Sequence, residues 1–215
     1  MLEINKELEK YILEHTSEED ELLAELTRTT HLKVLQPRML SGKLQGKILE
    51  MFSKMIAPKY ILEIGTFTGY SAICLAQGLT HEGILHTVDV NEETLEIAQQ
   101  YISRSNVADK ITIHTGSALD IVPKLNIIFD FVFIDGDKRE YLEYYHAVFN
   151  KVRPGGFIFA DNVLWDGKIT EDIKHNDKYT KGRADFNDYV VKDKRVECVL
   201  LPFRDGMMAL RKNNY

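Results

Sequence analysis

The chain is poor in the residues and runs that define disulfide-rich, collagen-like and membrane-spanning proteins. Its 215 residues include two cysteines, five prolines and one tryptophan. Cys74 and Cys198 fall in a predicted helix and a predicted strand, far apart in the sequence, so we expect both to be reduced thiols in the core. No apolar run approaches the ~18–20 residues that span a bilayer. Because these features are scarce or absent, we expect an ordinary soluble globular protein.

Signals of export and of several domains are also missing. The segment Met1-Leu-Glu-Ile-Asn-Lys6 lacks the basic-then-apolar order of a signal peptide, which favours a cytoplasmic location. No repeat, low-complexity segment or Pro/Gly/Ser-rich linker divides the chain. We therefore expect one domain over residues 1–215, with a helical N-terminal part at residues 1–58.

Negative charge is concentrated at the N-terminus. Residues 1–30 carry nine acidic and three basic side chains, whereas the remaining 185 residues carry 24 of each. A solvated helical face accounts for this pattern most simply. An acidic arm also repels phosphate groups, which counts against a nucleic acid or a coenzyme A thioester as the substrate.

The apolar periodicity changes near residue 59. Before it, helical spacing dominates, with Leu40, Leu44 and Ile48 recurring every fourth residue, and Pro37 and Pro58 bounding this third helix. After it, short apolar runs alternate with amphipathic helices. The expected strands are 60–64, 84–90, 110–114, 129–134 and 156–160, and the expected helices are 69–79, 92–104, 117–124 and 138–150. A helix near 184–193 and an antiparallel hairpin of strands 195–201 and 207–211 complete the chain. This alternation predicts a doubly wound α/β sheet.

The turn after the first strand has the features of a nucleoside-binding site. Gly65 and Gly69 allow a tight turn that passes close to a ligand, and their spacing differs from the G-x-G-x-x-G of pyrophosphate binders. Glu63 is a carboxylate in an apolar strand, which is costly to bury unless a partner such as an amino group binds it. Asp89 ends the second strand, where an acid can bind both ribose hydroxyls. An acid at the N-terminus of the helix that begins near Asn91 is the alternative interpretation.

Three oxygen ligands follow two later strands. Asp135 follows strand 129–134, and Asp161 and Asn162 follow strand 156–160. One crossover helix separates these strands, so we expect them to be neighbours about 4.8 Å apart. Two lone carboxylates would repel each other, whereas a divalent cation would relieve that repulsion. Carboxylate and amide oxygens suit Mg²⁺ or Mn²⁺. Helix capping and turn formation by Asp and Asn remain the alternative.

Together these motifs resemble a known family over Met39–Leu210. The segments that carry the resemblance are Leu62-Glu-Ile-Gly-Thr-Phe-Thr-Gly-Tyr-Ser71, Val88-Asp89, Phe129-Asp-Phe-Val-Phe-Ile-Asp-Gly-Asp-Lys138, Gly155-Gly-Phe-Ile-Phe-Ala-Asp-Asn-Val-Leu-Trp165 and Asp205-Gly206. They are similar to the cation-dependent class I S-adenosylmethionine O-methyltransferases, which include the caffeoyl-CoA and catechol enzymes. The resemblance implies a Rossmann-like seven-stranded sheet of order 3-2-1-4-5-7-6 with the last strand antiparallel. It also implies a homodimer.

The resemblance also implies roles for individual residues. The cofactor-binding residues would be Met39 and Ser41 of the third helix, Glu63, Gly65, Thr66, Ser71, Asp89, Ala118 and Asp135. The ligands of a magnesium ion, or of manganese or calcium, would be Asp135, Asp161 and Asn162. Asp135 and Lys138 would be catalytic, with Lys138 beside the acceptor hydroxyl, although on its own Lys138 reads as a solvated lysine in a helix turn. Trp165 would shape the acceptor pocket, with a plain core aromatic as the alternative.

The expected reaction is methyl transfer from S-adenosylmethionine to a hydroxyl of a small catechol-like acceptor. A tRNA hydroxyuridine O-methyltransferase is the first alternative, because Lys168, Lys174, Lys178, Lys181 and Arg183 form a possible basic patch. A nucleotide-binding module without catalysis and a nicotinamide oxidoreductase are the others. No membrane partner is expected.

Overall fold

A computed structural model describes residues 5–214. In its first part, the chain forms α1 (Lys6–Glu14), α2 (Glu21–Lys33), a 3₁₀ turn η1 (Pro37–Met39) and α3 (Gly42–Ile56). Strands and helices then alternate as β1 (Tyr60–Ile64), α4 (Tyr70–Ala76), β2 (Ile84–Asp89), α5 (Glu92–Ile102), η2 (Ala108–Lys110), β3 (Ile111–Thr115), α6 (Ala118–Ile121) and η3 (Val122–Lys124). The remainder is β4 (Phe129–Ile134), η4 (Lys138–Glu140), α7 (Tyr141–Phe149), β5 (Val152–Asp161), η5 (Lys168–Thr170), α8 (Lys178–Val190), β6 (Val196–Leu201) and β7 (Met207–Lys212).

The strands form one seven-stranded sheet of order β3-β2-β1-β4-β5-β7-β6, which confirms the predicted topology. Strands β1 to β5 pair in parallel, and β7 runs antiparallel to both of its neighbours. Strand order reverses between β1 and β4, where the chain has crossed from one face of the sheet to the other. Ligands of doubly wound sheets bind beyond the carboxyl ends of the strands at such a point.

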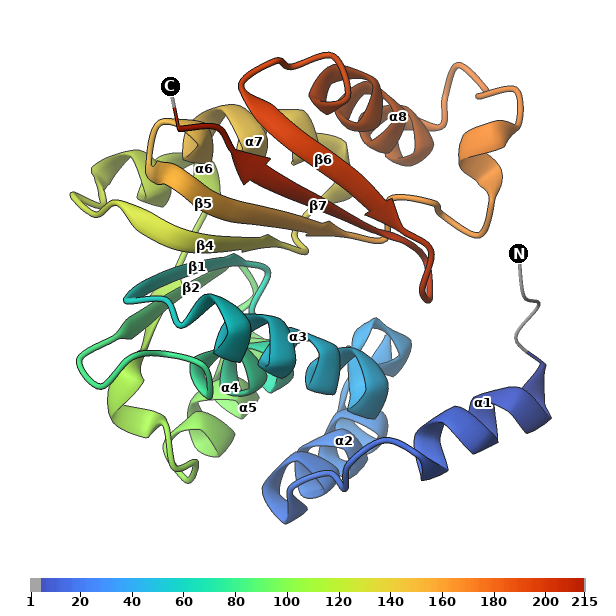
Figure 1. Cartoon of the computed structure of the whole chain (residues 1–215). Helices are drawn as coiled ribbons and strands as arrows, with labels where there is room; N and C mark the ends of the chain where they lie inside the picture. Colours follow the sequence, from blue (N-terminus) through green and yellow to red (C-terminus); the bar gives the residue numbers. More distant parts are fainter. Residues whose placement is uncertain (1–4, 215) are drawn as a thin grey trace.

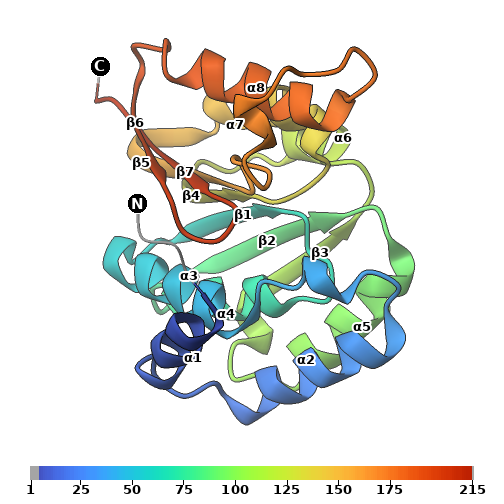
Figure 2. The same cartoon turned by 90° about the vertical axis from the view of Figure 1, so that its right-hand side faces the viewer.

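Helices cover both faces of the sheet (Figures 1 and 2). Strand β4 shows why: Phe131 and Phe133 pack into a cluster with α3, α4 and α5, whereas Val132 and Ile134 pack into a second cluster with α6, α7 and α8. A strand buried on both faces must be apolar throughout, as the sequence predicted. Packing in these two clusters holds β4 in place and therefore fixes the position of its carboxyl end, where the polar residues lie.

The N-terminal helices differ in how firmly they are attached. Leu26 of α2 and Leu49 of α3 are fully buried, whereas α1 contains no buried residue. Within residues 5–214, no helix has both the length and the apolarity needed to cross a membrane. Glu3, one of the acids counted in the N-terminal arm, lies outside the described residues.

Several predicted details were wrong. The last helix spans Lys178–Val190 instead of residues 184–193, because Asp177 caps it by accepting a hydrogen bond from the Thr180 amide. Met39 belongs to η1 and Ser41 precedes α3, so neither lies within the third helix. Cys74 is buried as expected, but Cys198 is exposed because it lies on the edge strand β6.

Candidate active site at the carboxyl ends of the strands

Four of the predicted site residues form a row along one edge of the sheet. The register pairs Val88 with Ile64, Ile64 with Ile134, and Ile134 with Ala160. The residue after each of these therefore lies at the same level, which gives the order Asp89, Gly65, Asp135 and Asp161 from β2 to β5. Because neighbouring strands are about 4.8 Å apart, the carboxylates of this row are close enough to influence each other.

The turn after β1 is tight and lies close to the segment after β4, and glycine makes this backbone path possible. Gly65 has φ +105° and Gly69 has φ +88°, a region that other residues rarely adopt. A Cβ atom on Gly65 would lie 2.4 Å from the carbonyl oxygen of Asp135. Gly69 is the N-cap residue directly before α4. The predicted tight turn is confirmed, and it brings the β1 backbone against the segment that follows β4.

Glu63 is a buried acid with an unused oxygen atom. It is 0% exposed, and its Oε2 accepts a hydrogen bond of 2.6 Å from Thr87. Its Oε1 has no hydrogen-bond partner among the described residues. Burial raises the pKa of Glu63 to about 8; the neighbouring Ser71 and Thr87 hydroxyls oppose this effect, and the charges of Asp135 and Asp89 add to it. A cationic partner would restore the ionised form and use the free oxygen.

Asp89 faces the same turn. Its Oδ2 accepts a hydrogen bond of 2.9 Å from the Phe67 amide, and its Oδ1 accepts one from the Asn91 amide. Asn91 itself caps α5, and Asp89 lies two residues before this cap, near the start of the helix. Among the other expected cofactor residues, Thr66 bonds Thr87, Ser71 lies on α4, Ala118 begins α6, and Met39 is 56% exposed.

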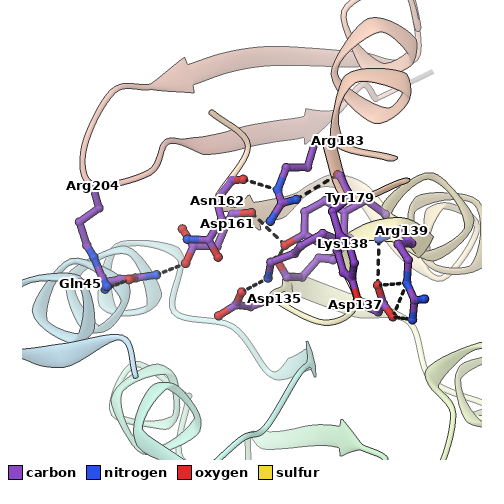
Figure 3. A network of polar contacts seen from close by, with 12 residues as sticks. Gln45, Asp135, Asp137, Lys138, Arg139, Asp161, Asn162, Tyr179, Arg183 and Arg204 are labelled. Atoms are coloured by element: carbon purple, nitrogen blue, oxygen red, sulfur yellow. Dashed lines mark hydrogen bonds and ion pairs between the residues drawn. The ribbon is translucent and has the colours of Figure 1, made fainter. Parts of the chain in front are cut away.

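The second half of the row carries the expected metal ligands and catalytic lysine. Lys138 forms an ion pair with Asp135, and both side chains are largely buried (Figure 3). Asp161 is 3% exposed. Burial raises the pKa of Asp161 to about 6, and the charge of Asp135 adds to this effect. The two carboxylates therefore repel each other, as the sequence predicted.

Two residues that the sequence analysis missed hold Asp161 in place. Gln45 of α3 donates a hydrogen bond of 2.5 Å from its Nε2 to Asp161 Oδ2. Arg204, in the loop between β6 and β7, donates to Gln45 Oε1 and to the carbonyl oxygen of Ser41. The signal for Gln45 was its position one turn before the buried Leu49, on the apolar face of an amphipathic helix.

The segment after Asp161 has an unusual backbone. Asn162, Trp165 and Asp166 have φ values of +55°, +52° and +50°. Arg183 of α8 holds this segment, because its Nε donates a hydrogen bond of 2.8 Å to the Asn162 carbonyl oxygen and its guanidinium lies 3.8 Å from the centre of the Trp165 ring. Trp165 is half-buried, so it is not a plain core aromatic. Arg183 is almost fully buried and was also missed as a site residue.

The possible basic patch on this segment is weaker than its sequence suggests. Arg183 is buried, and Lys181 forms an ion pair of 2.6 Å with Asp185. Arg139, beside the segment, is paired with Asp137. Two of the five predicted members are thus buried or paired, which weakens the support for a phosphate-binding surface, whereas Lys168, Lys174 and Lys178 are exposed.

The strand order, the glycine turn and the acid at the end of β2 define a class I methyltransferase fold with a nucleoside-cofactor site. Comparison with known proteins identifies the family. The chain belongs to the O-methyltransferase family, whose model matches residues 13–213. It is 34% identical to a caffeoyl-CoA O-methyltransferase of Petroselinum crispum over 218 residues, which cover 95% of this chain and 90% of the relative. It is 36% identical over 179 residues to a Zea mays caffeoyl-CoA O-methyltransferase, covering 78% and 68% of the two chains.

Solved structures agree with this assignment. The O-methyltransferase TomG of Streptomyces achromogenes, in complex with S-adenosylmethionine, superposes with a TM-score of 0.90 at 29% identity, over 96% of each chain. A Bacillus cereus O-methyltransferase in complex with S-adenosylhomocysteine superposes with a TM-score of 0.91 at 30% identity, over 96% of this chain and 97% of that one. The predicted family and the predicted S-adenosylmethionine-dependent O-methyltransferase activity are confirmed.

Proposed function

We propose that this enzyme methylates a hydroxyl of a small catechol-like acceptor with the help of a divalent cation. The observation that carries the proposal is the pair of repelling carboxylates, Asp135 and Asp161, at adjacent strand ends. Such a pair is costly to keep in a largely buried site. Lys138 forms an ion pair with Asp135, and a divalent cation between the two strand ends would neutralise both carboxylates. Caffeoyl-CoA, the acceptor named for the plant relatives, carries a catechol, which supports the choice of acceptor class.

The chain has the groups that an adenosyl cofactor requires. We assign the amino group of its methionine part to Glu63 Oε1, the buried oxygen without a partner. Gly65, Thr66 and Ser71 would surround that part, and Asp89 would accept hydrogen bonds from the ribose hydroxyls. Met39, Ser41 and Ala118 would line the remaining sides, and Asp135 would close the site toward the acceptor. S-adenosylmethionine supplies the methyl group.

The donor set also fits a hard divalent cation. Within residues 5–214, no group of three or more His, Cys, Asp or Glu side chains is arranged to hold a metal. A site built from Asp135, Asp161 and Asn162 therefore depends on an amide oxygen as its third protein ligand, which suits Mg²⁺, Mn²⁺ or Ca²⁺ and not zinc. When bound, the cation would lower the pKa of a coordinated acceptor hydroxyl.

The remaining roles belong to Lys138 and Trp165. Lys138 forms an ion pair with Asp135. A divalent cation bound beside it would disfavour the ammonium form, and the neutral amine would then be able to accept the acceptor's hydroxyl proton. Trp165, stacked on Arg183, would form a flat wall for an aromatic ring. Holding the acceptor oxygen next to the methyl donor supplies much of the rate enhancement.

The direct test is a methyl-transfer screen over catechols, flavonoids and bulk tRNA, with Mg²⁺ and then with EDTA. We expect transfer to catechols that EDTA abolishes. Asp161→Ala should lower the rate by at least about a hundredfold, because a cation ligand is lost, while S-adenosylhomocysteine binding stays nearly unchanged.

Asp109→Ala is the matched control, since Asp109 is an exposed acid on η2, and it should behave as wild type. Full activity of Asp161→Ala, or activity that survives EDTA, would refute the metal assignment. Transfer to tRNA alone would replace the catechol proposal with the RNA alternative.

A further inference from the structure

A chain of polar contacts links the loop between β6 and β7 to Asp161 (Figure 3). Arg204 donates to Gln45 Oε1, and Gln45 Nε2 donates to Asp161 Oδ2 at 2.5 Å. Arg204 and Gln45 are 159 positions apart in the sequence, and Gln45 and Asp161 are 116 apart, so only the folded sheet brings them together. Gln45 is 1% exposed, and its amide is therefore isolated from water.

The arginine determines which way the glutamine amide faces. A guanidinium has only hydrogen-bond donors, so the atom that it contacts on Gln45 must be the oxygen. The amide nitrogen is then the atom left for Asp161, and Gln45 cannot offer its oxygen to a cation. Gln45 thus acts on the carboxylate only as a donor, and it occupies one of the two carboxylate oxygens.

The same guanidinium also contacts the segment before α3, which contains Ser41, one of the residues assigned above to the cofactor. Arg204 donates to the carbonyl oxygen of Ser41, and it lies 3.5 Å from that of Leu40. Ser41 precedes α3, which carries Gln45 one turn later. One side chain therefore holds both the start of α3 and the orientation of Gln45.

We propose that Gln45, oriented by Arg204, is a positioning residue that fixes the Asp161 carboxylate for the divalent cation. The inference rests on the metal site proposed above. By occupying Oδ2, Gln45 leaves Oδ1 as the oxygen that faces the cation and restricts rotation of the carboxylate. Partners that orient a ligand in this way commonly affect metal affinity by about 10–100-fold.

Mn²⁺ binding to the metal-free protein tests the inference without requiring catalysis. The free Mn²⁺ signal in electron paramagnetic resonance gives the dissociation constant, and calorimetry gives that of S-adenosylhomocysteine. Gln45→Met keeps the length of the side chain and removes its donor. We expect Gln45→Met to bind Mn²⁺ at least about tenfold more weakly, with nearly unchanged S-adenosylhomocysteine affinity. Arg204→Met should weaken the binding of both Mn²⁺ and S-adenosylhomocysteine, because Arg204 holds both Gln45 and the start of α3.

The double variant tests whether the two residues act as one unit. If Arg204 acts on Asp161 through Gln45, Gln45→Met/Arg204→Met should bind Mn²⁺ no more weakly than Gln45→Met alone. Arg204 is exposed, so its replacement carries the test if Gln45→Met fails to fold. The controls are Gln77→Met, which breaks a surface bond to Asn106, and Arg211→Met on β7.

The outcomes separate this inference from the proposed function. Wild-type Mn²⁺ affinity in folded Gln45→Met, even with a lowered melting temperature, would overturn the positioning role and leave the metal site standing. Additive losses in the double variant would overturn the link through Gln45. Absence of Mn²⁺ binding by the wild-type protein would overturn both proposals.

Discussion

At the scale of single residues, Glu63 gives the clearest link between burial and function. Its pKa is raised to about 8 from 4.5, chiefly by burial. Between these values the folded protein keeps a proton that the unfolded chain has released, so stability from this group is complete below pH 4.5 and is lost as the pH rises through 8. The ligand-free enzyme should therefore lose stability across this range.

Glu63→Gln should remove that loss, since the amide cannot ionise. The difference between variant and wild type in the free energy of unfolding should change by roughly 2–4 kcal/mol between pH 5 and 8, because one pKa unit is worth about 1.4 kcal/mol. Denaturant titrations at several pH values measure it. The exposed Glu96→Gln on α5 should leave the wild-type profile unchanged. Tight S-adenosylhomocysteine binding by Glu63→Gln would contradict the assigned role.

Residue chemistry also sets how far the sequence could predict the site. Glu63, Asp89, Asp135 and Asp161 were found because each charged residue ends or interrupts an apolar strand. Arg183 was predicted to belong to a possible basic patch, although it shares a helix face with the buried Phe186 and Val190. Its spacing of three and seven residues from Phe186 and Val190 was the signal that could have predicted its burial. Arg204 left no such signal, because its contacts exist only after β7 has paired with β5.

At the scale of elements, α8 supports the segment that carries Asn162 and Trp165. Arg183 and Asn187 both donate to carbonyl oxygens of that segment, those of Asn162 and Val163. The left-handed backbone at Trp165 costs of order 1–3 kcal/mol, and surrounding contacts must offset it. We infer that α8 stabilises the shape of the acceptor pocket.

Arg183→Lys should loosen this support, because lysine keeps the charge but loses the planar fork. We expect about 1–3 kcal/mol less stability and a higher KM for the acceptor, with unchanged S-adenosylhomocysteine affinity. Steady-state kinetics and calorimetry measure the two effects. Lys181→Met, two residues away and exposed, should behave as wild type. An unchanged acceptor KM would show that Trp165 is held by other contacts.

Element boundaries show where local signals end. Strand β5 begins at Val152, whereas the sequence predicted a start at residue 156. The prediction was wrong because the Arg153-Pro-Gly-Gly segment has the composition of a turn. Helix α8 begins six residues before the expected start, since its first turn is polar and is specified by the Asp177 cap. Pairing of Val152 with Phe129 of β4 sets the first boundary and the Asp177 cap sets the second, and periodicity carries little information about either.

At the scale of the whole molecule, the sheet order was predictable because the strand–helix alternation and the family resemblance agreed. The parallel register then placed Asp89, Gly65, Asp135 and Asp161 in one row. The sequence did not predict that α3 and the β6–β7 loop contact this row through Gln45 and Arg204. The active site is thus a property of the assembled sheet edge, where the methyl donor and the acceptor must meet.

The most direct test of this account is a crystal structure of the protein grown with Mg²⁺, S-adenosylhomocysteine and a catechol. The account predicts one octahedral ion bound by Asp135, Asp161 and Asn162, with both catechol oxygens and one water completing its coordination and the reacting oxygen near Lys138 and the cofactor sulfur. Asp135, Asp161 and Asn162 turned away from one another, with no ion among them at saturating Mg²⁺, would contradict it.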